Sequence, residues 1–188
     1  MRHPTFSSLR RNPMRATIFA LCLLATPVFA KSNPDKLVVH IKNSDGQDAG
    51  TATFKQLKDG KLLIKLSLKN IDFGPHAVHI HQHPVCDAPD FEGAGPHFNP
   101  AGKQHGTLNP LGHHNGDLPE NISIGEDHTG DITFKVDDLS LDPDAPDSIT
   151  AHGGTSIVIH EHADDMKTNP TGNSGNRIAC GVITAPIP

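Results

Sequence analysis

The sequence predicts an antiparallel all-β fold, and three observations support this prediction. Apolar and polar residues alternate with a period of two in seven segments, which is the pattern of strands with one buried face. Turn-forming residues separate these segments, as in NSDG at Asn43, KDGK at Lys58 and DFGP at Asp72. The chain has 188 residues, of which 35% are hydrophobic, and this suits one compact domain with a sizeable core.

The alternating segments are interpreted as strands in chain order. They are LVVHIK from Leu37, TATFKQL from Thr51, KLLIKLSLK from Lys61, HAVHIH from His76, DITFKV from Asp131, TSIVIH from Thr155 and IACGVI from Ile178. Two connections are much longer, at residues 82–120 and 161–176, and both are rich in Gly, Pro, Asn and Asp. Loops of that length inside a compact domain usually carry function. The acidic stretch that begins at Asp138 is interpreted as a solvated surface connection.

The first thirty residues have the order of a secretory signal. Arginines precede an apolar run at residues 16–29, and the small residue Ala30 follows it. A membrane anchor is disfavoured because the run is shorter than a membrane span. We therefore predict a signal peptide at residues 1–30, a mature domain at residues 31–188 and export to the periplasm. Met14 is an alternative start, since the segment from there to Ala30 already suffices as a signal.

The predicted mature chain is acidic. It holds 12 Lys and Arg against 21 Asp and Glu, a formal charge of −9. Neither basic runs nor base-stacking aromatic residues are present, so nucleic acid and anionic lipid are not expected as partners. Cys86 and Cys180 remain after export, and an oxidising compartment favours their pairing over two separate buried thiols. In the chain-entropy model, a disulfide that closes the segment between these two cysteines contributes roughly 4 to 5 kcal/mol to the free energy of unfolding.

Histidines gather in three distant segments, and their spacing indicates metal binding. His79 and His81 lie two apart on a predicted strand, so both side chains leave the same face. His160 ends another strand and could reach the same ion, whereas His76 has the opposite parity and should point elsewhere. Imidazole-rich sites suit copper or zinc, and a flattened nitrogen set suits copper(II).

The long loop at residues 82–120 offers a second set of ligands. His97, His105, His114 and Asp117 provide three nitrogens and one oxygen, which is the closed tetrahedral set that structural zinc prefers. Glycines and prolines around them let a short backbone curl around an ion. Any one of these residues alone is better interpreted as a surface loop side chain, but the joint pattern favours a site.

The motifs together resemble the copper,zinc superoxide dismutase family, bacterial periplasmic type. They are GPHAVHIH, AGPHFNPAGKQHG, HNGDL, IHEHADD and GNRIACGVI, and they run through most of the predicted mature chain. The resemblance implies an eight-stranded antiparallel Greek-key β-barrel with two long functional loops. It also implies one copper and one zinc per subunit and either a monomer or a homodimer, of which we expect the dimer.

Roles for individual residues follow from the resemblance. The implied copper ligands are His79, His81, His97 and His160, and the implied zinc ligands are His97, His105, His114 and Asp117. His97 would then bridge both ions, and Asp164 would join His79 to His105 as an outer carboxylate. The resemblance also implies that Cys86 and Cys180 form the family disulfide and that Arg177 is the active-site arginine.

The implied activity is dismutation of superoxide to dioxygen and hydrogen peroxide, which protects the periplasm from oxidative damage. The alternative is a non-catalytic copper- and zinc-binding periplasmic protein, and a purely structural barrel leaves the ligand sets unexplained. Lys167 is expected to help steer superoxide, because residues 165–177 contain this lysine and no glutamate. Seven further histidines are expected in core or surface roles, with metal capture or haem binding as a second interpretation for His83, His113 and His162. The seven are His40, His76, His83, His113, His128, His152 and His162.

Overall fold

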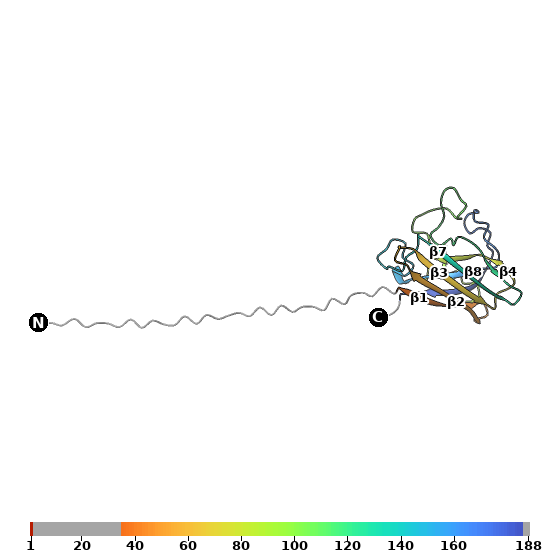
Figure 1. The fold of residues 1–188 in the computed structure, drawn as a ribbon, viewed down its shortest axis with the longest axis horizontal. Helices are drawn as coiled ribbons and strands as arrows, with labels where there is room; N and C mark the ends of the chain where they lie inside the picture. Colours follow the sequence, from red (N-terminus) through yellow and green to blue (C-terminus); the bar gives the residue numbers. More distant parts are fainter. Residues whose placement is uncertain (2–34, 186–188) are drawn as a thin grey trace. The chain divides into compact units, whose positions relative to one another are not determined.

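The computed structural model describes Met1 and residues 35–185, and the predicted signal segment therefore lies almost wholly outside the described residues. Residues 35–185 hold nine strands and two short 3-10 helices (Figure 1). Among them no helix is long and apolar enough to cross a membrane. The elements are β1 (Lys36–Asn43), β2 (Asp48–Gln56), β3 (Leu62–Lys69), β4 (Gly74–His76), β5 (Val78–His81), η1 (Glu92–Ala94), β6 (Ile122–Ile124), β7 (Thr129–Val136), η2 (Ala151–Gly153), β8 (Thr155–His160) and β9 (Arg177–Ile183).

Seven strands form one curled antiparallel sheet, in the order β5-β8-β9-β1-β2-β3-β7. A two-stranded sheet of β4 and β6 bridges its two edges, because β6 lies beside β7 while β4 continues through Ala77 into β5. Counted as one bent strand, β4 and β5 bring the total to eight. The predicted all-β fold is confirmed. Strand β6 was not expected from the sequence.

The core fills the space between two walls of the curled sheet. Alternate side chains of β2, β3 and β7, such as Phe54, Ile64 and Phe134, pack into the same buried cluster as Ile80 of β5 and Ile157 of β8. Burying each such side chain contributes about 1.5–3 kcal/mol. Because both walls turn one face to this core, their other faces point away from each other. The outer face of β5 and β8 and the outer face of β2 and β3 therefore lie on opposite sides of the barrel.

The loop after β5 is fastened to the outer side of β8 and β9. Cys86 and Cys180 form a disulfide, with their Cα atoms 5.6 Å apart, as predicted from the sequence. Around it Phe91, Ala94 and Val158 form a second small apolar cluster. The disulfide and this cluster hold the loop over the outer face of β5 and β8, where the histidines lie.

Candidate metal centre

Strand alternation places three histidines on the outer face of β5 and β8. Val78 and Ile80 point into the core, so His79 and His81 point outward between them, and His160 ends the neighbouring strand β8. His81 Nε2 lies 3.3 Å from His160 Nε2. The loop adds His97, whose backbone pairs with that of His81 in an isolated antiparallel β-bridge. We call His79, His81, His97 and His160 the strand set; all four are buried, and their ligand atoms lie within 4.8 Å of one another.

A second set of four side chains surrounds one carboxylate oxygen in the loop. Asp117 Oδ1 lies 2.8 Å from His97 Nδ1, 3.1 Å from His105 Nδ1 and 3.2 Å from His114 Nδ1. A tetrahedral zinc ion with ligand bonds of about 2.0 Å requires ligand atoms roughly 3.3 Å apart. We call His97, His105, His114 and Asp117 the loop set. Its spacing therefore fits one tetrahedral ion.

The ring of His97 belongs to both sets. Its Nδ1 faces Asp117, while its Nε2 is buried and has no hydrogen-bond partner among the described residues. The His79 and His81 ring centroids lie 4.0 and 4.9 Å from that of His97. His79 Nδ1 is buried without a partner as well, and His105 Nδ1 is buried with only the Asp117 carboxylate, 3.1 Å away, beside it. Buried polar atoms normally have partners, so these three nitrogens fit metal ligands.

Asp164 connects the two sets through the far sides of their rings. Its carboxylate oxygens lie 2.8 Å from His79 Nε2 and 3.0 Å from His105 Nε2. Burial raises the pKa of this carboxyl, but the hydrogen bonds from His105 and His79 outweigh burial and lower the pKa below its usual range. Gly172 has a positive φ of 65°, and a Cβ there would overlap the Asp164 carboxylate. The second long loop is therefore shaped around this aspartate.

Asn121 holds Asp164 in place, and the sequence analysis did not identify it. Its side-chain amide donates to the Asp164 carbonyl at 3.0 Å, and its Oδ1 accepts from the Asp164 backbone N–H at 2.8 Å. An asparagine four residues after Asp117 carries no distinctive motif. Only the close approach of residues 121 and 164 in the fold gives it this role.

The two sets differ in their affinity for protons. Burial lowers the pKa of His81 and His160 well below the usual value, and the neighbouring imidazoles lower it further. Burial and the charge of His79 lower the pKa of His97 to about 3. Burial also disfavours the charged ring of His105, but its hydrogen bonds with Asp117 and Asp164 prevail and raise the pKa to about 9. Without metal, His81, His97 and His160 are therefore neutral near pH 7, whereas His105 carries a proton.

Arg177 opens β9 beside the centre. Its guanidinium donates to the carbonyl oxygens of Phe91 and Gly95, each at 2.7 Å. The Gly95 carbonyl also accepts from His81 Nδ1 at 2.8 Å, so one backbone group orients both side chains. Burial lowers the pKa of Arg177 and the charges of Glu92 and Asp90 oppose this, but a guanidinium stays charged in proteins.

Two cavities meet at Arg177. One, of about 570 Å³, reaches His97 and contains no carboxylate among its lining residues, which are Gln82, Pro96, His97, Asn99, His114, Pro170, Thr171 and Arg177. The other, of about 650 Å³, has three carboxylates among its lining residues, those of Asp90, Glu92 and Glu161. An anion therefore meets less repulsion in the first cavity, whose lining includes the shared ring of His97.

Two further residues from the sequence analysis are placed by the structure. His76 is buried, and its ring nitrogens lie 2.8 Å from the carbonyl oxygens of His160 and Asp72, as expected for a bracing residue behind the centre. Lys167 is exposed on the second long loop. It does not line the cavity that reaches His97, although Pro170 and Thr171 of the same loop do.

Comparison with known proteins gives one consistent family. A family model described as copper/zinc superoxide dismutase (SODC) matches residues 48–183. Superoxide dismutase (Cu-Zn) 1 of Aquifex aeolicus is 41% identical over 169 residues, which cover 87% of this chain and 96% of that protein. The superoxide dismutase-like protein YojM of Bacillus subtilis is 41% identical over 146 residues, covering 77% and 74%. A crystal structure of a SOD-like protein from Bacillus subtilis matches with a TM-score of 0.74 and 41% identity, covering 78% of this chain and 97% of that one.

Proposed function

Since this chain belongs to the copper/zinc superoxide dismutase family, with copper and zinc as its cofactors, we propose that it is an exported enzyme that dismutates superoxide. The overall reaction converts two superoxide anions and two protons into one dioxygen and one hydrogen peroxide. The observation that carries the proposal is the shared ring of His97, whose two nitrogens face two different ligand sets. Storage of either metal alone does not require such sharing.

The strand set would hold copper and the loop set would hold zinc. This assignment follows the chemistry of the donors: four imidazoles suit copper, and three imidazoles with one carboxylate in a tetrahedral arrangement suit zinc. When bound, copper supplies the one-electron oxidation and reduction, and zinc supplies a fixed charge without redox chemistry. The unpartnered Nδ1 of His79 and Nε2 of His97 support this fit in the strand set, and the 3.1 Å approach of His105 Nδ1 to Asp117 supports it in the loop set.

The protein's own residues bind the anion and handle the protons. Arg177 places a fixed positive charge at the cavity that contains no carboxylate, so superoxide is attracted to the wall formed by His97. His97 would hold a proton at Nε2 when that nitrogen is not bound to copper and would pass it to the departing peroxide, whose second proton would come from water. Asp164 keeps His79 and His105 oriented through their other nitrogens, so that Nδ1 of each faces its ion.

Turnover of superoxide by the metal-loaded protein tests this proposal directly. We expect rapid consumption of superoxide that cyanide inhibits, and Arg177→Gln should lower the rate while the copper and zinc contents stay unchanged. Lys103→Gln, which removes a positive charge outside the lining of the cavity, is the matched control. If the fully loaded protein consumed superoxide no faster than buffer alone, this result would contradict the proposal.

The second candidate is a copper- and zinc-binding protein without turnover. It is retained because one relative is named a superoxide dismutase-like protein. Both candidates require metal binding, but only the enzyme requires the charge of Arg177 beside the cavity. A loaded protein whose metal content is stoichiometric and whose superoxide consumption is absent would favour this second function.

Export, steering and assembly stay predictions with their own tests. The mature N-terminus isolated from the periplasm should be Lys31, and sedimentation should show a homodimer.

We expect Lys167→Ala to lower the rate of superoxide consumption and to weaken the salt dependence of that rate, because steering acts through charges that salt screens. An unchanged rate and salt dependence would remove that role from Lys167.

A further inference from the structure

The charges of this acidic protein are separated along the chain. Residues 35–69 and 129–136, which form β1, β2, β3 and β7, contain eight lysines and five aspartates, a net charge of +3. The rest of residues 35–185 contains three basic and sixteen acidic residues, a net charge of −13. The expectation that anionic lipid is not a partner rested on the net charge and on the absence of basic runs in the sequence, and neither observation shows how the charges are distributed over the folded surface.

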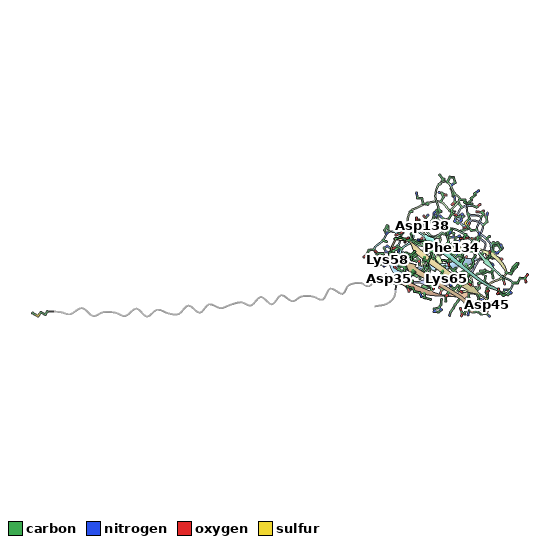
Figure 2. The ribbon with its side chains drawn as sticks, in the orientation of Figure 1. Asp35, Asp45, Lys58, Lys65, Phe134 and Asp138 are labelled. Carbon is green, nitrogen blue, oxygen red and sulfur yellow. A yellow bond between two sulfur atoms is a disulfide. The ribbon has the colours of Figure 1, made fainter. Side chains whose placement is uncertain are left out.

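Six of these eight lysines lie on the strands and share the outer face of one wall. Their side chains alternate with the buried core residues of the same strands, and each is exposed. Lys65, which is labelled in Figure 2 together with the buried Phe134, lies on β3 in the middle of this wall. The six lysines on the strands are Lys36, Lys42, Lys55, Lys65, Lys69 and Lys135.

The strand register brings several of these ammonium groups together. Lys36 lies directly opposite Lys55, and Thr53 lies opposite Lys65, which places Lys55 and Lys65 on a diagonal of the same face. Lys135 lies opposite Leu63 and is thus diagonal to Lys65 as well. Diagonal positions are about 7–8 Å apart, and like charges directly opposite each other destabilise a sheet. This arrangement does not help folding.

Part of this charge has no partner within the protein. Lys69 and Lys135 form ion pairs with Asp48 and Asp59, at 2.7 and 2.8 Å. Within residues 35–185 the structure shows no such pair for Lys36, Lys55 or Lys65, nor for Lys42. Val38 lies two residues after Lys36 on the same face and is 46% exposed. The lysine-rich face therefore offers unpaired ammonium groups beside a small apolar contact.

We propose that this outer face of β1, β2, β3 and β7 docks on an anionic phospholipid bilayer. Charge complementarity favours this occupant, because ammonium groups spread over four strands match an extended layer of phosphates without requiring shape recognition. The chain has no Trp and no Tyr, so stacking on bases or sugars is poorly served. Each lysine near such a surface strengthens binding by about fivefold.

The geometry permits this contact in spite of the net negative charge. The metal centre and its acidic loops lie outside the opposite wall of β5 and β8. Charges beyond about 8 Å are largely screened at physiological salt, so the far loops repel the bilayer only weakly. The docked protein then turns the cavity at Arg177 toward the solution, where superoxide arrives.

Vesicle binding by the metal-loaded protein tests the proposal. Vesicles of phosphatidylglycerol and phosphatidylcholine in equal parts should retain the protein at low salt and release it at about 0.5 M NaCl. Vesicles of phosphatidylcholine alone should not retain it. Absence of binding to the anionic vesicles at low salt overturns the proposal, as does binding to soluble polyphosphate or polyglutamate without binding to the vesicles.

A matched pair of double variants separates the lysine-rich face from net charge. Lys55→Gln with Lys65→Gln should weaken vesicle binding by roughly 25-fold, since two fivefold contributions are lost. Lys103→Gln with Lys167→Gln makes the same change of charge on exposed positions of the two long loops and should leave binding unchanged. Equal losses in both double variants would show that net charge alone acts and would overturn the proposal. Thermal unfolding of all three proteins verifies that they are folded.

Discussion

Three of the four imidazoles in the strand set stand on or beside strands β5 and β8, whereas all members of the loop set, the shared His97 included, come from the connection between β5 and β6. The alternation that buries Ile80 fixes His79 and His81. The loop ligands depend instead on the disulfide, on Asp164 and on tight turns. The half of the centre that the strand set forms is therefore shaped by the barrel itself, and the half that the loop set forms needs additional supports.

Removing the disulfide should have the largest effect and should act mainly on the loop half. In Cys86→Ser with Cys180→Ser, the free energy of unfolding should fall by about 4–5 kcal/mol, since a loop of 94 residues is no longer closed in the unfolded chain. Chemical denaturation of the variant beside the oxidised wild type measures the difference. Equal stability of the two proteins would show that the loop is held by packing alone.

The next largest effect should be a difference in how the metal affinities of the loop set and the strand set depend on pH. His105 has a pKa of about 9 without metal, so zinc must displace a proton at lower pH. Zinc affinity should therefore rise with pH by up to tenfold per unit, or about 50-fold between pH 7 and 9, where half of the His105 rings have lost the proton. Burial keeps His81 and His160 neutral, so copper(II) affinity should change little over that range.

Competition titrations against a chelator of known protonation measure both affinities. Zinc affinity should also fall when acid is added below pH 7, and zinc should be lost as the imidazoles take up protons. A zinc affinity that does not change between pH 7 and 9, or zinc retained far below the ordinary histidine pKa, would contradict the assignment of the loop set.

Asp164 should affect both ligand sets at once, because its carboxylate contacts His79 of the strand set and His105 of the loop set. Asp164→Asn should lower the affinity for both metals by about 10- to 100-fold, which is the usual cost of losing an outer partner of a ligating histidine. Asp131→Asn, on the exposed face of β7, removes the same charge as a control. If only one metal were weakened, the carboxylate would support a single half.

Asn121→Ala should produce the smallest of these effects. It removes two hydrogen bonds to the Asp164 backbone, each contributing about 1 kcal/mol. Both metal affinities should fall less than in Asp164→Asn, and adding Asn121→Ala to Asp164→Asn should cost little more. Additive losses in a double-mutant cycle would show that Asn121 acts independently of Asp164.

The sequence predicted the parts of this molecule that follow a local period or a motif. Alternation identified the long strands and placed His79 and His81 on one face, and motif spacing identified the loop set. Strand β6 was missed because three residues, Ile122–Ile124, show too little alternation within a long connection. The anchors of Arg177 were missed because backbone carbonyls of Phe91 and Gly95 have no signature in sequence. The lysine-rich face required the strand register.

The central claim is that the ring of His97 joins two different ions. Anomalous diffraction at the copper and zinc absorption edges, on crystals of the oxidised, fully loaded protein, tests it most directly. We predict copper beside Nε2 and zinc beside Nδ1, on the order of 6 Å apart across the ring. A single ion on His97, or two ions too far apart to share the ring, would contradict the proposed centre and the activity derived from it.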